Sequence, residues 1–195
     1  MPAIVSVSEV WARRDVFVRS LTPSEREIFE RLAVDKRKQD WLAGRIAGKR
    51  AVQKETGLPF HRIEIRVEES GRPRVFAGGQ ASELFLSITH SADFAAAIAG
   101  RAPIGLDLEK IEPRDRSFED LVLTAEDRAR LDGLTGVERD QHLTLLWCEK
   151  EAYAKLIGDG LRIPFAELAV PAGVTMERGT IDLGGVAFAF AISVR

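Results

Sequence analysis

The spacing of apolar and polar residues predicts a chain that mixes helices and strands. Short apolar or alternating segments predict strands over residues 3–7, 63–67, 104–109 and 168–170. Paired runs over residues 84–89 and 94–99 predict a hairpin that turns about residues 90–93, and a second hairpin ends in the run 185–194. Helices are predicted from residues 23 and 125, and two longer helices should end near residues 55 and 157.

Two of the predicted helices begin with the same local signal. Thr22 precedes Pro23 and is followed three residues later by Glu25, which is a capping box with proline at the first helical position. Thr124 and Asp127 repeat this arrangement 102 residues further along the chain. The recurrence indicates that one half of the chain is a diverged copy of the other.

The correspondence extends through the long predicted helices. Residues 49–57 (KRAVQKETG) and 150–158 (KEAYAKLIG) share Lys, Ala, Lys and Gly at an offset of 101, and GLPF at residue 57 is echoed by GLRIPF at residue 160. Chance is the alternative, because these residue types are common, yet both halves repeat one order of elements. We predict an α+β fold of two similar halves, residues 1–101 and 102–195.

The strand over residues 104–109 combines apolar residues with two carboxylates. Residues i and i+2 of a strand share a face, so Asp107 and Glu109 should lie side by side, opposite Leu106 and Leu108. The long helix of the same half presents Trp147, Glu151 and Lys155 on one stripe. A solvent-facing edge strand and a surface ion pair are the structural alternatives, the latter worth about 0.3–0.5 kcal/mol. Three carboxylates without His or Cys instead suit Mg²⁺.

The cations that could meet a phosphate gather in the first half. Its long helix carries Arg45, Lys49 and Arg50, the segment SGRPR carries Arg72 and Arg74, and Thr89 and His90 lie at the end of a predicted strand. Each has a structural alternative: a solvated helix charge, a turn residue before proline, or a histidine bonded to the backbone. An acidic half combined with a basic half suits a substrate that contains pyrophosphate.

Composition narrows the classes of function. The 195 residues include 28 Lys and Arg against 30 Asp and Glu, so there is no overall positive field for a nucleic acid. Cys148 is the single cysteine; it excludes an internal disulfide, and we expect it to be a packing residue. The start of the chain meets charge too early for a signal peptide, and no apolar run approaches a membrane span of about 20 residues. We expect a cytoplasmic protein without membrane partners.

Four segments together resemble a known family. They are GRP, LSITHS, IGLDLE and WCEKEAYAKLIGDGL, and LAGRI on the first long helix adds to them. In this order and spacing they resemble the 4'-phosphopantetheinyl transferases of the larger, pseudo-dimeric, surfactin-synthetase-activating class. The resemblance spans residues 42–161. Ser87 and Thr89 depart from the Asn and Ser that are usual in that class, which puts one local hydrogen bond in doubt.

The resemblance implies a fold, a reaction and the roles of the residues. These enzymes transfer the 4'-phosphopantetheine arm of coenzyme A to a serine of an apo acyl or peptidyl carrier protein and release 3',5'-ADP. The second half would bind Mg²⁺ and catalyse, and the first half would bind the 3'-phosphate of coenzyme A. The implied metal ligands are Asp107, Glu109 and Glu151; Glu151 would also be the general base, Lys155 would bind the bridging phosphates, and Arg45, Arg72, Thr89 and His90 would hold the 3'-phosphate.

Two other functions and several details stay open at this point. A non-catalytic relative that binds coenzyme A or carrier is one alternative, although all three carboxylates are present. A Mg²⁺-dependent phosphohydrolase is the other. The sequence does not identify the carrier, and the internal pair of halves favours a monomer.

Overall fold

The computed structural model describes residues 1–158 and 164–195 of the chain, which divide into two compact units, Met1–Ile104 and Gly105–Arg195. The predicted boundary, between residues 101 and 102, falls in the short connection before strand β7 (Ile104–Lys110). Within the described residues no helix is both long and apolar enough to cross a membrane.

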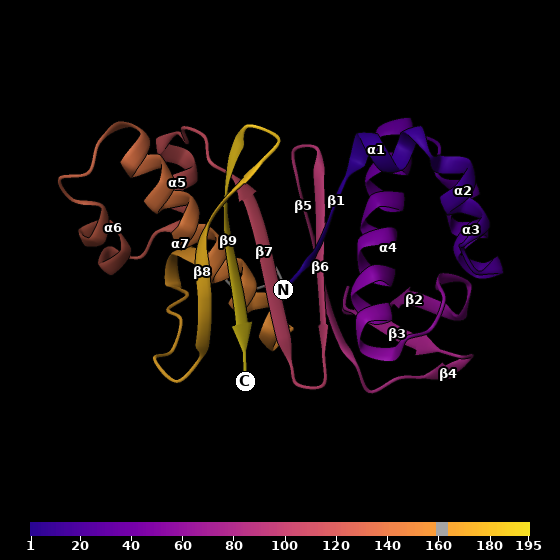
Figure 1. Ribbon diagram of the computed structural model, residues 1–195. Coiled ribbons are helices and arrows are strands. Elements are labelled where there is room, and N and C mark those ends of the chain that lie inside the picture. Colours follow the sequence, from indigo (N-terminus) through magenta and orange to yellow (C-terminus); the bar gives the residue numbers. More distant parts are fainter. Residues whose placement is uncertain (159–163) are drawn as a thin grey trace. The chain divides into compact units, whose positions relative to one another are not determined.

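The first unit is built around a three-stranded sheet in which β6 is central. Its strands, in spatial order, are β1 (Ala3–Ser6), β6 (Phe94–Gly100) and β5 (Phe85–Ser91). Helix α4 (Asp35–Thr56) contacts all three strands and runs along the sheet (Figure 1). Ile46, Ala47 and Val52 of α4 are fully buried in the core between helix and sheet. This packing fixes the helix that carries Arg45 against the strand that carries His90.

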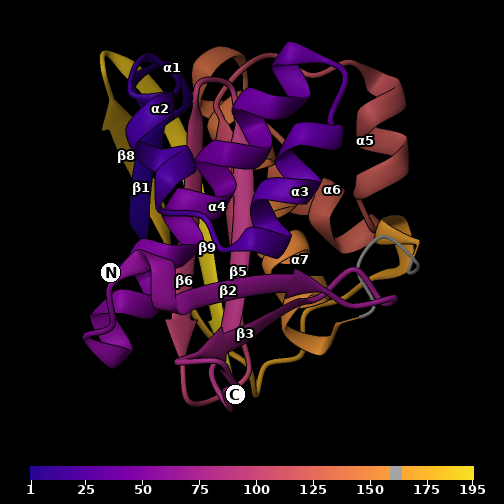
Figure 2. The same cartoon turned by 90° about the vertical axis from the view of Figure 1, so that its right-hand side faces the viewer.

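A second small sheet and three short helices complete this unit. The sheet consists of β2 (Ile63–Val67), β3 (Pro73–Ala77) and β4 (Gln80–Ala81). Strand β3 packs on β5, and Figure 2 shows β2 crossing in front of β5. The helices are α1 (Val7–Ala12), α2 (Arg14–Arg19) and α3 (Pro23–Arg31), and η1 (Phe60–Arg62) is a single 3₁₀ turn.

The first strand is shorter than the sequence predicted. The prediction extended it through Val7, but β1 ends at Ser6 and Val7 begins α1. The hydroxyl of Ser6 accepts a hydrogen bond from the backbone N–H of Glu9, which is an N-cap. Asp93 also accepts from the N–H of Ser8 at 3.0 Å. These side-chain caps, which the apolar pattern does not reveal, turn the chain into a helix.

The part of the second unit that the structure describes has the same arrangement with fewer strands. Its sheet runs β7, β9 (Val186–Val194) and β8 (Thr175–Leu183). Helix α7 (Gly136–Ile157) lies against β9 and β8 (Figure 1). The other helices are α5 (Arg116–Val122) and α6 (Ala125–Leu131), with a 3₁₀ turn, η3 (Phe165–Glu167).

The predicted strand over residues 168–170 is wrong. These residues are irregular: the N–H of Leu168 donates to the carbonyl of Phe165 at 3.1 Å and closes the η3 turn. The Leu168 side chain is buried in a small cluster with Tyr153 and Phe165. Its apolar character therefore reflects packing under a turn, and Pro171 follows too soon for a ladder to form.

The structure confirms the prediction of two similar α+β halves. In each unit the last strand of the main sheet is central: β6 lies between β1 and β5, and β9 lies between β7 and β8. Helices α4 and α7 each have 22 residues and end at Gly57 and Gly158, which have φ of 71° and 83°. Both predicted capping boxes are present, at Thr22 and Thr124. Gly160 and Leu161 end the segment WCEKEAYAKLIGDGL and begin the segment GLRIPF that resembles GLPF; both residues lie outside the described residues.

Candidate active site

Strand β7 and helix α7 approach each other so closely at Gly105 that no side chain fits there. A Cβ atom at this position would overlap the carbonyl oxygen of Ala152 and lie 2.8 Å from the backbone nitrogen of Leu156. Both obstacles are backbone atoms of α7. The missing side chain therefore lets the strand that bears Asp107 lie directly on the helix that bears Glu151 and Lys155.

Asp107 and Lys155 form the central contact of this unit. The Lys155 Nζ donates to Asp107 Oδ1 at 2.7 Å and to the carbonyl of Leu106 at 3.1 Å. Glu151 Oε2 is more distant, at 3.9 Å from the same Nζ. Asp107 is only 2% exposed. The predicted surface ion pair between Glu151 and Lys155 is thus a secondary contact, and the main partner of Lys155 comes from the strand.

Burial and charge shift the pKa values of the groups in this cluster. Burial alone would lower the pKa of Lys155, but the charge and hydrogen bond of Asp107, together with Glu151, raise it. The pKa of Glu151 is raised by burial and by Asp107, against the opposing effect of Lys155. Glu151 therefore has a greater affinity for a proton than an exposed glutamate, which suits a group that must accept one.

Cys148 lies at the back of the same cluster. Burial, followed by the charges of Asp107 and Glu109, raises the pKa of its thiol well above the usual value. The thiol donates weakly to the carbonyl of Ala189 at 3.5 Å. A thiol that stays protonated is neither a nucleophile nor a soft metal ligand, which agrees with a packing role.

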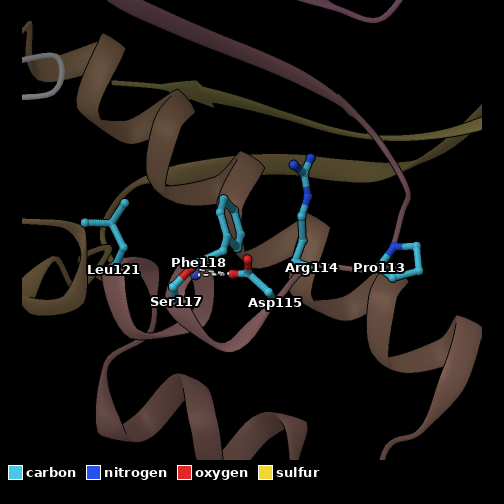
Figure 3. Close-up of a pocket in the computed structure, with 6 residues that line it drawn as sticks. All are labelled: Pro113, Arg114, Asp115, Ser117, Phe118 and Leu121. Atoms are coloured by element: carbon cyan, nitrogen blue, oxygen red, sulfur yellow. Dashed lines mark hydrogen bonds between the residues drawn. The ribbon is translucent and has the colours of Figure 1, made fainter.

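Glu109 has a cation of its own. Its Oε2 lies 3.7 Å from the guanidinium of Arg114, which also reaches Glu112 at 3.4 Å. Arg114 and Phe118 line a pocket at the start of α5, shown in Figure 3, where the Asp115 carboxylate accepts from the N–H of Phe118 at 2.9 Å. The charges of all three predicted metal ligands are thus met by cationic side chains of this unit.

The donor set fits Mg²⁺ in its chemistry. Among the residues that the structure describes, no group of three His, Cys, Asp or Glu side chains is close enough to hold a metal ion by itself. Magnesium, however, usually binds one or two carboxylates together with water and substrate phosphates. Asp107, with Glu109 two residues further on β7 and Glu151 opposite, supplies oxygen ligands of that kind.

Arg45, the first of the predicted phosphate ligands, is buried in the first unit. Its Nη1 donates to the carbonyl of Ile65 at 2.6 Å, and its Nε lies 4.0 Å from Glu25 Oε1. The guanidinium carbon is 4.5 Å from the centre of the Trp41 ring. Arg45 therefore joins α4 to β2, in addition to any part it takes in binding a ligand.

His90 is exposed and rests on helix α4. Its Nε2 lies 2.8 Å from the carbonyl of Asp40, so this nitrogen carries the proton of that bond. Gly44 makes the approach possible, since a Cβ there would lie 2.5 Å from His90 Cε1. Thr89, the residue before His90 in β5, is buried and belongs to the opposite face of the strand. Arg72 ends the turn between β2 and β3.

Several residues of this arrangement were not singled out from the sequence. Gly44 and Gly48 show a spacing of four on a helix, which is a signal of close packing on one face. Gly105 was quoted only as part of a motif and Lys150 only as a marker of the repeat, whereas Lys49 was counted among the cations that could meet a phosphate. No sequence pattern marks Arg114 as the partner of Glu109, because this ion pair depends on the path of the chain after β7.

Comparison with known proteins assigns both units to one family. The 4'-phosphopantetheinyl transferase N-terminal domain matches residues 24–100, and the 4'-phosphopantetheinyl transferase superfamily matches residues 103–184. These ranges contain every predicted site residue: Arg45, Arg72, Thr89 and His90 in the first and Asp107, Glu109, Glu151 and Lys155 in the second.

Individual proteins are similar to parts of the chain. The holo-[acyl-carrier-protein] synthase of Geobacillus sp. is 36% identical over 98 residues, 47% of this chain and 82% of that protein. The 4'-phosphopantetheinyl transferase psf-1 of Bacillus pumilus is 27% identical over 67% of this chain, and the match spans 54% of psf-1. A crystal structure of a Bacillus anthracis holo-(acyl-carrier-protein) synthase in complex with CoA (3',5'-ADP) matches 50% of this chain and 90% of its own, with 30% identity and a TM-score of 0.45. The chain belongs to the 4'-phosphopantetheinyl transferase superfamily, which confirms the family and the class of enzyme that the motifs predicted.

Proposed function

We propose that the protein transfers the 4'-phosphopantetheine arm of coenzyme A to a serine of an apo acyl or peptidyl carrier protein. The serine Oγ forms a bond to the phosphorus nearest the pantetheine, the bond from that phosphorus to the bridging oxygen breaks, and 3',5'-ADP leaves. The observation that carries the proposal is the contact of Lys155 with the buried Asp107, beside Glu151, in the segment matched to the family.

The residues of the second unit divide the chemical work. A Glu151 oxygen accepts the proton that the serine hydroxyl loses, and its raised pKa favours this role. The ammonium of Lys155 stabilises the negative charge that develops on the departing ADP. Asp107 holds Lys155 at 2.7 Å, so that the cation is oriented before substrate binds.

Magnesium would be held by Asp107, Glu109 and Glu151. When bound, it supplies positive charge that offsets the charge of the coenzyme A pyrophosphate. Chelator should therefore stop transfer, and the binding of Mg²⁺ to the protein saturated with coenzyme A can be followed by calorimetric titration. In Asp107→Ala, we expect no detectable Mg²⁺ binding and a fall in transfer of orders of magnitude; wild-type titration and turnover in this variant would contradict the metal assignment.

The first unit would hold the 3'-phosphate of coenzyme A through Arg45, Arg72, Thr89 and His90. His90 is the member of this set whose side chain is exposed, and Asp40 already orients its ring. A protonated histidine or an arginine forms charge-assisted hydrogen bonds with phosphate. The carrier protein contributes the accepting serine.

A transfer assay tests the proposed function directly. The purified protein is mixed with coenzyme A, Mg²⁺ and each of several apo carriers, and the carrier is examined by mass spectrometry. A gain equal to the phosphopantetheine arm is expected, with none on a carrier whose acceptor serine is replaced by alanine. Cleavage of coenzyme A without carrier would favour the phosphohydrolase, and binding of coenzyme A without either reaction would favour the non-catalytic relative.

Recognition of the 3'-phosphate gives a second expected result. His90→Ala should raise the Kd for coenzyme A roughly tenfold to a hundredfold, because a charge-assisted hydrogen bond is worth about 1.5–3 kcal/mol. The Kd for 3'-dephospho-coenzyme A should stay the same. Isothermal titration of both ligands measures the difference, and equal losses for both would remove His90 from the phosphate site.

Glycine substitutions on α4 provide a matched test of the same site. Gly44→Ala places a methyl group where the His90 ring lies, so it should move the ring and reproduce the selective loss. Gly48→Ala, one turn later, meets the ends of Ile65 and Ile88 instead, at 2.7 and 3.1 Å. It should affect both ligands alike. A ligand-selective loss from Gly48→Ala alone would show that helix packing, not His90, decides the preference.

A further inference from the structure

In each unit, one lysine of the long helix is buried within a set of oxygen atoms. Lys49 is 0% exposed and Lys150 is 3% exposed. Lys49 Nζ lies 2.6 Å from Glu25 Oε2 and donates to the carbonyls of Phe60, at 2.9 Å, and Ile63. Its pKa is lowered by burial, and the charge of Glu25 opposes this effect.

Lys150 has an equivalent set of partners in the second unit. Its Nζ lies 2.6 Å from Asp127 Oδ2 and donates to the carbonyls of Val122, at 2.7 Å, and Phe165, at 2.8 Å. Phe60 and Phe165 both belong to the 3₁₀ turn that follows the long helix. The two lysines therefore occupy equivalent places in the repeat.

The acidic partners already have a structural task. Glu25 and Asp127 are the third residues of the two capping boxes, and each accepts from the backbone N–H of its capping threonine at 3.0 Å. Each lysine thus connects the middle of a long helix to the start of a capped helix and to a 3₁₀ turn. Since an ammonium has three protons and Lys150 has three acceptors, none is left for a phosphate.

We propose that Lys150 is a positioning residue, which holds α7 so that Glu151 and Lys155 face Asp107. The inference rests on the proposed function. At about 100° per residue, Lys150 lies roughly 100° around the helix from Glu151 and roughly 140° from Lys155, so it fixes α7 on a different side from both groups. Lys49 has the same contacts, yet Arg50 stands where Glu151 stands in the second unit. The contacts are therefore a device of the fold, and the second unit uses them to aim its catalytic helix.

The test replaces each lysine by methionine, which keeps the length and apolar stem but not the charge. Both variants should unfold at lower temperature than the wild type. Lys150→Met should in addition lower kcat about a hundredfold with little change in the KM for coenzyme A, because a misplacement of about 1 Å can cost that much. Lys49→Met should leave kcat within about twofold of the wild type. The kcat values of the two variants should therefore differ by a factor that a transfer assay resolves easily.

Two further measurements keep the outcome decisive. If Lys150→Met does not fold, Lys150→Met combined with Asp127→Asn removes the unpaired buried charge while retaining an oxygen for the capping box. A crystal structure of Lys150→Met, or of its combination with Asp127→Asn, should show Lys155 Nζ moved away from Asp107 Oδ1. An unchanged 2.7 Å separation between these atoms would overturn the proposal. So would a raised KM with normal kcat, or equal kcat losses in the Lys49 and Lys150 variants. An inactive wild type would count against the proposed function alone, because the crystallographic comparison needs no activity.

Discussion

Gly105→Ala is expected to reduce transfer about a hundredfold and to destabilise the second unit by about 1–3 kcal/mol. The added methyl group would overlap the carbonyl of Ala152 and crowd the nitrogen of Leu156. Because both are helix backbone atoms, the conflict is relieved only by moving β7 away from α7. That movement separates Asp107 from Lys155, whose contact the proposed reaction needs. Urea unfolding and the carrier mass assay measure the two effects.

The control for this substitution is Gly173→Ala in the same unit. A Cβ at residue 173 meets no atom within 4 Å, and the glycine does not have the positive φ that would strain alanine. Its stability and turnover should match the wild type. If Gly105→Ala also kept wild-type turnover, the close approach of strand and helix would have no role in the reaction.

The internal repeat could be predicted from the sequence because the residues that begin and end the helices are similar in the two halves. Capping boxes at Thr22 and Thr124 and terminal glycines at Gly57 and Gly158 are local signals, and local signals survive divergence of the core. The strand predicted over residues 168–170 failed for the opposite reason. Burial of Leu168 depends on a tertiary cluster, and three apolar residues do not distinguish a strand from a packed turn.

The acidic cluster was only partly accessible. Period-two alternation placed Asp107 and Glu109 on one face of β7, and the helical period placed Glu151 near Lys155. The sequence did not reveal that the strand and helix touch at Gly105, so the pairing of Lys155 with Asp107 was not predicted. Distances between elements depend on which glycine permits contact, and a glycine in a motif looks the same whether or not another backbone lies against it.

Arg45 illustrates a residue whose burial could not be read from the pattern. Its helix position was compatible with a solvated charge, yet its guanidinium is bonded to the carbonyl of Ile65 and lies near Glu25. The sequence shows Glu25 only as a capping-box residue; the structure shows that it is buried and that Lys49, at 2.6 Å, is a nearer cation for it than Arg45. The assignment of Arg45 to the 3'-phosphate stays a prediction, and variants of Arg45 will also report on the packing of α4 against β2.

Substitutions of Glu151 and Lys155 separate the proton acceptor from the phosphate ligand. Glu151→Gln retains size and one acceptor oxygen but cannot take a proton, so it should keep the Kd for coenzyme A while kcat falls about 10²–10⁴-fold. Lys155→Met should lose both affinity for coenzyme A and kcat, because the lysine charge meets phosphate in the ground state and more negative charge as ADP departs. Calorimetric titration and the transfer assay on both variants measure the two quantities.

Stability must be followed in the same variants, because Lys155 is also the ion-pair partner of a carboxylate that is only 2% exposed. Removing one member of a buried pair costs about 3–5 kcal/mol, so Lys155→Met should unfold well before Glu151→Gln, whose contact with Lys155 is 3.9 Å long. Lys155→Arg retains the charge and serves as the control for folding. A helix-surface ion pair between Glu151 and Lys155 would give similar, small stability losses in both variants with normal kinetics. Normal turnover in Glu151→Gln would therefore contradict the proposal that Glu151 accepts the proton. An undiminished coenzyme A affinity in Lys155→Met would contradict the proposal that Lys155 binds phosphate.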